Sequence, residues 1–396
     1  MTVDESIKSV LASVEGKLID AGYPDAARDA QLRAAIEQTL RASLAPVVPP
    51  AAPQAAPNLA GVNIPLQNIA ELLKLDRDAA PDAVESHCSV FLGAGAHFPE
   101  PAYPPPAGQP PRQPFPVAVR PPVGSTLAKE LAGQCAFANT FPNEYDGDWM
   151  RVSTWHEWTN GRNGPIGLEG RIRSSVETGK RGSEMLDQIA SWPCRTFYTT
   201  NFDTHLENAL LKHHDEIFVW AYHPKAFKDN PFDLRMNWWR MTPGKDAAKP
   251  GFERWAPAME PILNGQLPPE PPADKIAVFK LHGDVRVPGS VVITDDDYIK
   301  FLRRIAKFEL PRRLLLPLSS TILFIGYSLR DFNMRYVLSM LREERDRGWD
   351  GAAMSYAVDL RPDPLFKVTW QQRNGLIQFV EHNLWDIVPE ISNRLK

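Results

Sequence analysis

Four short segments gather side chains of the types that bind nucleotides and catalyse reactions on them. In chain order they are Phe91-Leu-Gly-Ala-Gly-Ala96, Thr199-Thr-Asn-Phe-Asp203, Lys280-Leu-His-Gly-Asp284 and Phe324-Ile-Gly-Tyr-Ser-Leu-Arg-Asp331. Each lies at or near the end of an apolar run typical of a buried strand. Ligands of open α/β sheets bind beyond the carboxyl ends of the strands. The sequence therefore predicts that the four segments converge on one nucleotide pocket.

The first and last segments contain glycine turns. Gly93-Ala94-Gly95 would let the backbone approach a pyrophosphate, whose charge is met by amide groups at a helix start. On its own this motif fits a simple strand-to-helix turn equally well. Gly326 and Ser328 likewise offer close approach and a hydroxyl group to phosphate or ribose oxygens. Phe98 replaces the third glycine of the dehydrogenase fingerprint, which disfavours hydride transfer.

The two middle segments supply candidate catalytic groups. Asn201 and Asp203 lie two residues apart at a strand end, so in extended geometry their side chains point the same way. A carboxamide beside a carboxylate is suited to hydrogen-bond a nicotinamide amide and a ribose or a water molecule. Helix capping by Asp203 would explain only one of the two residues. His282 also follows an apolar strand, and a neutral imidazole there is a good general base.

Composition excludes several classes of protein. The 396 residues are 43% apolar and 23% charged, enough for a substantial core. With a net charge of -4, the chain lacks the excess of positive charge that is typical of nucleic-acid-binding proteins. The sequence has no signal-peptide pattern, no run of membrane-spanning length and no Cys-x-x-Cys pair. We therefore expect a cytoplasmic protein with reduced thiols. Asp295-Asp-Asp297 predicts a solvated, helix-capping turn, and we expect no metal site.

The elements that position these residues follow from hydrophobic periodicity. Apolar runs of strand length occupy residues 88–92, 197–200, 276–281, 291–294, 321–325, 354–360 and 376–380. Helical patterns alternate with most of them, which predicts an α/β fold with a Rossmann-like, doubly wound parallel sheet. We expect an N-terminal helical arm at 1–44, a Pro/Ala-rich linker at 45–60 and a catalytic domain at 61–396. That domain would contain a helical insertion at about 140–195 and an irregular insertion at about 215–275.

Taken together, the four motifs resemble those of the sirtuin family, and more closely the prokaryotic sirtuin-like NAD hydrolases of antiphage defence. The resemblance spans roughly residues 86–381, and its strongest elements are Asn201/Asp203 and His282-Gly283. It implies a Rossmann-like domain with a small helical module and NAD across the strand ends. The four-cysteine zinc module of sirtuin deacylases is missing, which argues against acyl-lysine chemistry. His97 stands where a small residue usually follows the glycine turn, and Thr200 replaces the usual glutamine.

The resemblance also implies roles for individual residues. It assigns Asn201 to the ribose or attacking water, Asp203 to the nicotinamide amide and His282 to general base catalysis. The residues expected to contact the rest of the NAD molecule are Gly93, Ala94, Gly95, Thr200, Gly326, Ser328 and Asp359. Of these, the glycine turn would bind the pyrophosphate and Ser328 the adenosine side. Asp359 is expected at the second ribose because of its own position, at the end of the run Tyr356-Ala-Val-Asp.

The implied activity is that of an NAD+ glycohydrolase, a regulated NAD-depleting effector of bacterial antiphage defence. NAD+ would be the substrate, and no metal is expected. The helical arm suggests homo-oligomerisation, or docking on an associated ATPase or another subunit of the defence system. We expect no membrane partner and no direct nucleic-acid binding. Two alternatives remain: a nucleotide-binding sensor or structural subunit of an ATPase complex without turnover, and a zinc-less NAD-dependent deacylase.

Overall fold

The computed structural model describes residues 59–79, 87–98, 115–223, 236–244, 251–254, 275–305, 320–327, 329, 354–373 and 377–396. The predicted helical arm and nearly all of the predicted linker lie outside these ranges. All of the described residues belong to one compact unit, formed by residues 57–101 and 107–396.

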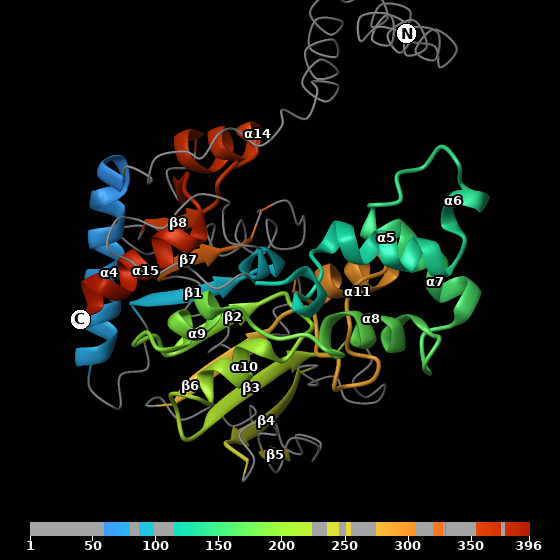
Figure 1. Ribbon diagram of the computed structural model, residues 1–396, viewed down its shortest axis with the longest axis horizontal. Coiled ribbons are helices and arrows are strands. Elements are labelled where there is room, and N and C mark those ends of the chain that lie inside the picture. The colour runs from blue at the N-terminus through green and yellow to red at the C-terminus, as the bar shows by residue number, and fades with distance from the viewer. Residues whose placement is uncertain are drawn as a thin grey trace, which may run out of the picture. The chain divides into compact units, whose positions relative to one another are not determined.

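Nine strands of the described chain form one sheet, in the order β5-β4-β3-β6-β2-β1-β7-β8-β9 (Figure 1). Their bounds are β1 Cys88–Leu92, β2 Thr196–Thr199, β3 Ile217–Tyr222, β4 Met236–Thr242, β5 Gly251–Arg254, β6 Ile276–Lys280, β7 Thr321–Ile325, β8 Ser355–Val358 and β9 Ile377–Val380. Every pairing from β3 to β9 is parallel, whereas β4 and β5 add antiparallel at one edge. The predicted Rossmann-like α/β fold is confirmed.

Helices cover both faces of the sheet. Their bounds are η1 Leu59–Val62, α4 Asn63–Asp78, η2 Ala94–His97, η3 Val117–Val119, α5 Gly124–Gln134, α6 Phe137–Thr140, α7 Trp149–Asn160, α8 Leu168–Glu177, α9 Glu184–Ala190, α10 His205–Leu210, α11 Asp295–Ile305, α14 Pro364–Lys367, the π-helical turn η5 Val368–Arg373 and α15 Leu384–Leu395. Helices α4, α9, α10 and α15 pack on one face, where α4 and α15 lie side by side (Figure 1).

Alternation along the strands explains how one sheet builds two cores. Successive side chains point to opposite faces, so Val90 and Val278 join the core under α4, α9, α10 and α15. Their neighbours Phe91 and Phe279 join a second core, which includes Phe301 of α11. Because both faces are covered, these central strands are apolar at nearly every position.

A helical module stands at the carboxyl end of the sheet. Helices α5, α6, α7 and α8 share a small core that includes Leu131 and Ile172. Phe202 and Val285, which follow β2 and β6, belong to the same core. The module therefore rests on the loops that carry the predicted catalytic residues.

Buried Arg162 fastens this module to the start of α11. Its guanidinium group pairs with Glu157 at 2.9 Å, Glu169 at 3.0 Å and Asp297 at 2.9 Å. Asp297 also accepts hydrogen bonds from the backbone N–H groups of Ile293 and Thr294. Asp295, Asp296 and Asp297 thus form the first turn of α11 instead of the predicted solvated turn before it. Asp297 N donates to Thr294 Oγ1 at 3.3 Å, and the carboxylate of Asp297 is buried.

Two sequence-based expectations are wrong. Residues 217–254 include three strands instead of an irregular insertion. The run that forms β3 is buried on both faces and shows no alternation, and its Trp- and Pro-rich surroundings obscure it. Residues 291–294, predicted as a strand, form no ladder. They are apolar because they pack into two cores, and Val292 N donates to His282 O at 2.9 Å.

Among the residues described, none of the helices has the length and apolar character needed to cross a membrane.

Candidate functional site at the carboxyl edge of the sheet

The glycine turns after β1 and β7 pack directly against each other. Gly93 N donates to Ile325 O at 3.0 Å, and Gly95 N donates to Gly326 O at 2.9 Å. A Cβ atom on Gly93 or Gly95 would come within 2.5 or 2.7 Å of Gly326 O. Gly326 has φ +62°, and a Cβ there would lie 2.1 Å from Ala96 N. Contact between the two turns therefore requires these glycines independently of any ligand.

Asn201 joins the loop after β2 to the first glycine turn. Its Nδ2 atom donates to Gly93 O at 3.3 Å, and its backbone N–H donates to Thr199 Oγ1 at 2.9 Å. Thr200 N lies 3.4 Å from Leu92 O and continues the ladder between β1 and β2. Both Thr200 and Asn201 are half-buried. The amide of Asn201 is therefore fixed at the sheet edge beside the predicted pyrophosphate turn.

Asp203 is buried, and each of its carboxylate oxygens contacts another residue of the chain. Oδ1 accepts the backbone N–H of His205 at 3.0 Å, which caps the start of α10. Oδ2 lies 3.4 Å from Nε2 of His97, a fully buried ring at the end of η2. Burial alone would raise the pKa of Asp203, but His97, His205 and Lys280 outweigh it and hold the pKa well below its usual range. The carboxylate is therefore ionised at neutral pH.

His97 was not predicted to have a role, although its place after the glycine turn was unusual. The structure accounts for it, because the imidazole reaches from the loop after β1 to the carboxylate of the loop after β2. Its ring also meets the ring of His205 edge to face, with centroids 5.8 Å apart. The histidine just after the glycine turn, where a small residue is usual, was the sequence signal that could have identified this contact.

His282 lies in the loop after β6. Its ring is 1% exposed and sits among aromatic side chains, with ring centroids 5.4 Å from Tyr298, 5.7 Å from Phe301 and 6.4 Å from Trp149. Gly283 follows with φ +85°, and a Cβ there would lie 2.0 Å from Ser290 O. This turn therefore needs glycine, and it directs the histidine toward α7 and α11.

The structure brings together the loops that carry Asn201 and His282. Strands β2 and β6 are neighbours, with Thr199 opposite Lys280. Beyond them, Leu281 N donates to Thr199 O at 2.9 Å, and Val285 N donates to Phe202 O at 3.1 Å. Within this joined edge the two side chains have different surroundings. Asn201 contacts the glycine turn, whereas His282 contacts aromatic rings of the helical module and α11.

A buried ionic cluster lies beneath these loops, and sequence reasoning missed it. It consists of Lys280, Glu207, Asp284 and Arg286, linked by N–O distances of 2.6 to 3.0 Å. Lys280, Glu207 and Asp284 are completely buried. A lysine at the end of the otherwise apolar run of β6 was the signal for it.

Of the remaining predicted residues, Ser328 lies outside the described residues. Asp359 is half-buried at the end of β8, where its Oδ1 accepts the backbone N–H of Arg361 at 2.9 Å. Ala94 begins the short helix η2. Within the described ranges, no three His, Cys, Asp or Glu side chains form a group suited to a metal ion.

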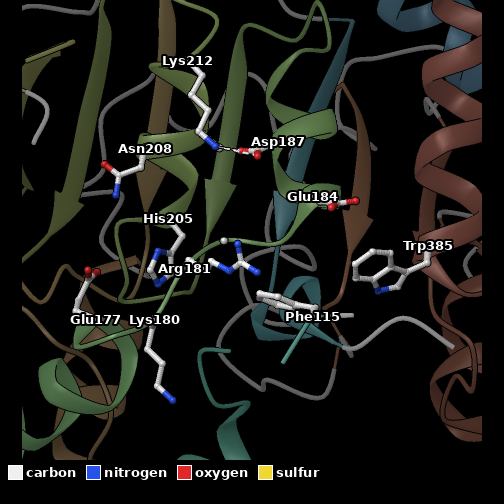
Figure 2. A pocket seen from close by; sticks show the side chains of 12 residues that line it. Phe115, Glu177, Lys180, Arg181, Glu184, Asp187, His205, Asn208, Lys212 and Trp385 are labelled. Atoms are coloured by element: carbon white, nitrogen blue, oxygen red, sulfur yellow. Dashed lines mark hydrogen bonds and ion pairs between the residues drawn. The ribbon is translucent and has the colours of Figure 1, made fainter. Parts of the chain in front are cut away.

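A cavity of about 300 Å³ opens beside α10 (Figure 2). Its lining residues are Phe115, Glu177, Lys180, Arg181, Gly182, Glu184, Asp187, His205, Asn208, Ala209, Lys212 and Trp385. None of Gly93, Asn201, Asp203 or His282 is among them. Figure 2 shows the ring of His205 at the cavity and the ion pair of Lys212 with Asp187. The cavity thus borders the Asp203 loop through His205 without containing the predicted site.

Comparison with known proteins finds similarity to SIR2-like domains and to NAD(+) hydrolases. A family model described as a SIR2-like domain matches residues 195–377. The NAD(+) hydrolase ThsA of Acinetobacter baumannii (strain 532279) is 26% identical over 193 residues, which cover 48% of this chain and 31% of that protein. The NAD(+) hydrolase ThsA of Bacillus cereus (strain MSX-D12) is 38% identical over 72 residues, 18% of this chain and 14% of that protein. The matched regions therefore span less than a third of these curated relatives.

Proposed function

We propose that this chain, whose residues 195–377 match a family model described as a SIR2-like domain, is an NAD+ glycohydrolase that cleaves NAD+ to nicotinamide and ADP-ribose. One observation carries the proposal. The loops after β1, β2, β6 and β7 meet at one sheet edge through direct hydrogen bonds, and they bring glycine turns, an amide, a carboxylate and an imidazole to it. The two ThsA relatives, which are named as NAD(+) hydrolases, support NAD+ as the substrate.

The proposed chemistry needs little covalent participation by the protein. The bond between nicotinamide and ribose breaks through an oxocarbenium-like state, and water adds to the anomeric carbon. Nicotinamide leaves as a neutral molecule, and one proton of the water is released. In this proposal Asn201 orients the water or the ribose, and His282 accepts the proton.

Asp203 would hold the nicotinamide amide. A carboxylate has about four lone-pair sites, and the contacts with His205 N and His97 use one on each oxygen. The ionised carboxylate can thus accept an amide N–H while it keeps its cap on α10. One aspartate could therefore both cap α10 and hydrogen-bond to the nicotinamide amide.

The burial of His282 supports regulation of the activity. Its ring is 1% exposed among aromatic side chains. The helical module or α11 must therefore move before substrate and water can reach the imidazole. We propose that assembly, or a partner subunit of an antiphage system, produces this movement. The protein would then act as an NAD-depleting effector that is restrained before infection.

The decisive experiment measures nicotinamide and ADP-ribose released from NAD+ by the purified chain, alone and with the products of neighbouring genes. We expect His282→Ala and Asn201→Ala each to lower turnover by about 10²- to 10⁴-fold. Asn208→Ala and His213→Ala, which replace exposed residues on or just after α10, serve as matched controls. Turnover that survives both site substitutions would refute the assigned roles.

A second function, nucleotide binding without turnover, is favoured by the same closed geometry. His282 is shielded, and both oxygens of Asp203 already have partners within the chain. A sensor or structural subunit would need no more than the glycine turns and strand ends. Calorimetric binding of NAD+ with no nicotinamide release in any assembly would identify this function.

A further inference from the structure

Lys280 stands where the two loops of the proposed site meet. It is the last residue of β6, and its side chain is completely buried. An ammonium group has three N–H donors, and Lys280 has three acceptors. They are Glu207 Oε1 at 3.0 Å, Asp284 Oδ2 at 2.9 Å and the backbone carbonyl of Asp203. One ammonium group therefore contacts both the β2 loop and the β6 loop.

The contacts on the β6 side enclose His282. Lys280 and Asp284 lie two residues before and two residues after it, and their ion pair closes the turn between them. Asp284 is also held by Arg286 at 2.6 Å, and its backbone N–H donates to Ser290 Oγ at 2.9 Å. The backbone of His282 is therefore fixed from both ends.

The contacts on the β2 side fix Asp203 and, through it, the segment that begins at Asn201. The carbonyl of Asp203 accepts from Lys280, while its carboxylate accepts from the first turn of α10. Glu207 on α10 joins Lys280 and Arg286. Helix α10 and the residues before it are thus anchored to the same cation.

Such a cluster is a poor way to gain stability. Burying charges costs several kcal/mol per ion, and apolar side chains of similar volume often serve stability equally well. With two cations and two carboxylates the cluster is neutral, and Arg286 further stacks on Trp239 with 5.1 Å to the ring centroid. The geometric specificity of charged hydrogen bonds is what an apolar replacement would lack.

We propose that Lys280 is a positioning residue that clamps the loop of Asn201 and Asp203 to the loop of His282. The clamp itself is a property of the fold, and its meaning for catalysis rests on the proposed NAD+ glycohydrolase function. Lys280 touches no reacting atom in this proposal. It acts by setting the relative placement of the amide and the imidazole.

The test uses the full chain and the double variant Lys280→Met/Glu207→Gln, which removes one positive and one negative charge and leaves the Asp284–Arg286 pair. Hydrogen–deuterium exchange is followed in peptides that cover residues 200–206 and 281–287. We expect both loops to exchange about tenfold faster than in the unaltered protein. Lys212→Met/Asp187→Asn removes an exposed ion pair near the same helix and should change neither loop.

A milder variant covers the case in which the double variant fails to fold. Glu207→Gln keeps a hydrogen-bond acceptor for Lys280 while it removes one charge, and it should speed exchange in both loops to a smaller degree. Ile189→Ala, a core substitution away from the loops, corrects for general loss of stability. Exchange that rises in only one loop, or in neither, overturns the clamp whether or not the protein cleaves NAD+.

Kinetics then separate positioning from substrate binding. If the unaltered protein cleaves NAD+, the double variant should lose about 10- to 100-fold in kcat, because small misplacements of catalytic groups are costly. Its KM should stay within about twofold. An unchanged kcat with loosened loops would refute the positioning role. Absence of NAD+ cleavage by the unaltered protein, both alone and with the products of neighbouring genes, would refute the proposed function, while the exchange result still decides the clamp.

Discussion

Two joints at the same sheet edge are built in opposite ways. The loops after β1 and β7 meet backbone to backbone, and the absence of side chains on Gly93, Gly95 and Gly326 permits their contact. The loops after β2 and β6 also share backbone hydrogen bonds, but charged side chains with Lys280 at the centre join them in addition. The glycine joint depends on shape, whereas the ionic joint depends on complete pairing of buried charge.

This difference explains which joint is visible in a sequence. A steric requirement for glycine leaves a compact Gly-x-Gly signature, because no other residue fits. The ionic joint draws on residues between 203 and 286, and only Lys280, a lysine at the end of an otherwise apolar strand, is unusual by itself. Motifs therefore reveal backbone constraints more readily than they reveal pairing between distant charges.

Breaking the ionic joint should have the largest effect on stability. Lys280→Met leaves the buried carboxylates of Glu207 and Asp284 with one cation, and we expect a loss of about 3–5 kcal/mol in the free energy of unfolding. Adding Glu207→Gln should recover part of that loss, because charge balance returns. Urea unfolding measures both variants. Equal destabilisation by the single and double variants would show that pairing is not the cause.

Gly326→Ala tests the glycine joint and should cost somewhat less, about 3 kcal/mol, since it combines overpacking with a left-handed backbone. The new Cβ would lie 2.1 Å from Ala96 N. Gly133→Ala is the matched control, because this helical position has nothing within 4 Å and alanine should stabilise it by up to about 1 kcal/mol. Similar unfolding curves for the two variants would contradict the steric account.

Acid should weaken the ionic joint selectively. Burial raises the pKa of Asp284, but Lys280 and Arg286 outweigh it and lower the pKa from 3.8 to about 2. A lowered carboxyl pKa adds stability above the unfolded-state value. Asp284 should therefore contribute on the order of 2 kcal/mol at neutral pH, lost as pH falls from about 4 to about 2.

Urea unfolding across this range, compared with Asp284→Asn, measures that contribution. The variant should lose less stability between pH 5 and pH 3 than the unaltered protein. If the free energy of unfolding falls equally with pH in the two proteins, Asp284 is not the source of the pH dependence.

An exposed ion pair should show the smallest effect. Lys212 and Asp187 lie 2.7 Å apart at the cavity rim, with side chains 58% and 41% exposed. Solvent screening limits such pairs, so Lys212→Met should change unfolding by less than about 0.5 kcal/mol. A loss comparable with that of Lys280→Met would mean that burial does not distinguish the two pairs.

Much of the fold could be predicted because its signals are local. Apolar runs with intervening helices predicted the parallel sheet, and the strand ends predicted where the motifs meet. The run of β3 was missed because a strand buried on both faces has no alternation to detect. Residues 291–294 were predicted as a strand because burial in a loop and burial in a sheet select the same apolar residues.

By itself the amino-acid sequence determined the α/β class, the order of the motifs and their place at strand ends, since periodicity and glycine content are properties of neighbouring residues. Only tertiary structure decided that His97 faces Asp203, that aromatic rings enclose His282 and that one lysine joins two loops. The His97–Asp203 contact and the contacts of Lys280 with Asp203 and Glu207 join residues from about 70 to more than 100 positions apart in the chain. Charge and shape act through space, so their partners become evident only once the chain has brought them together.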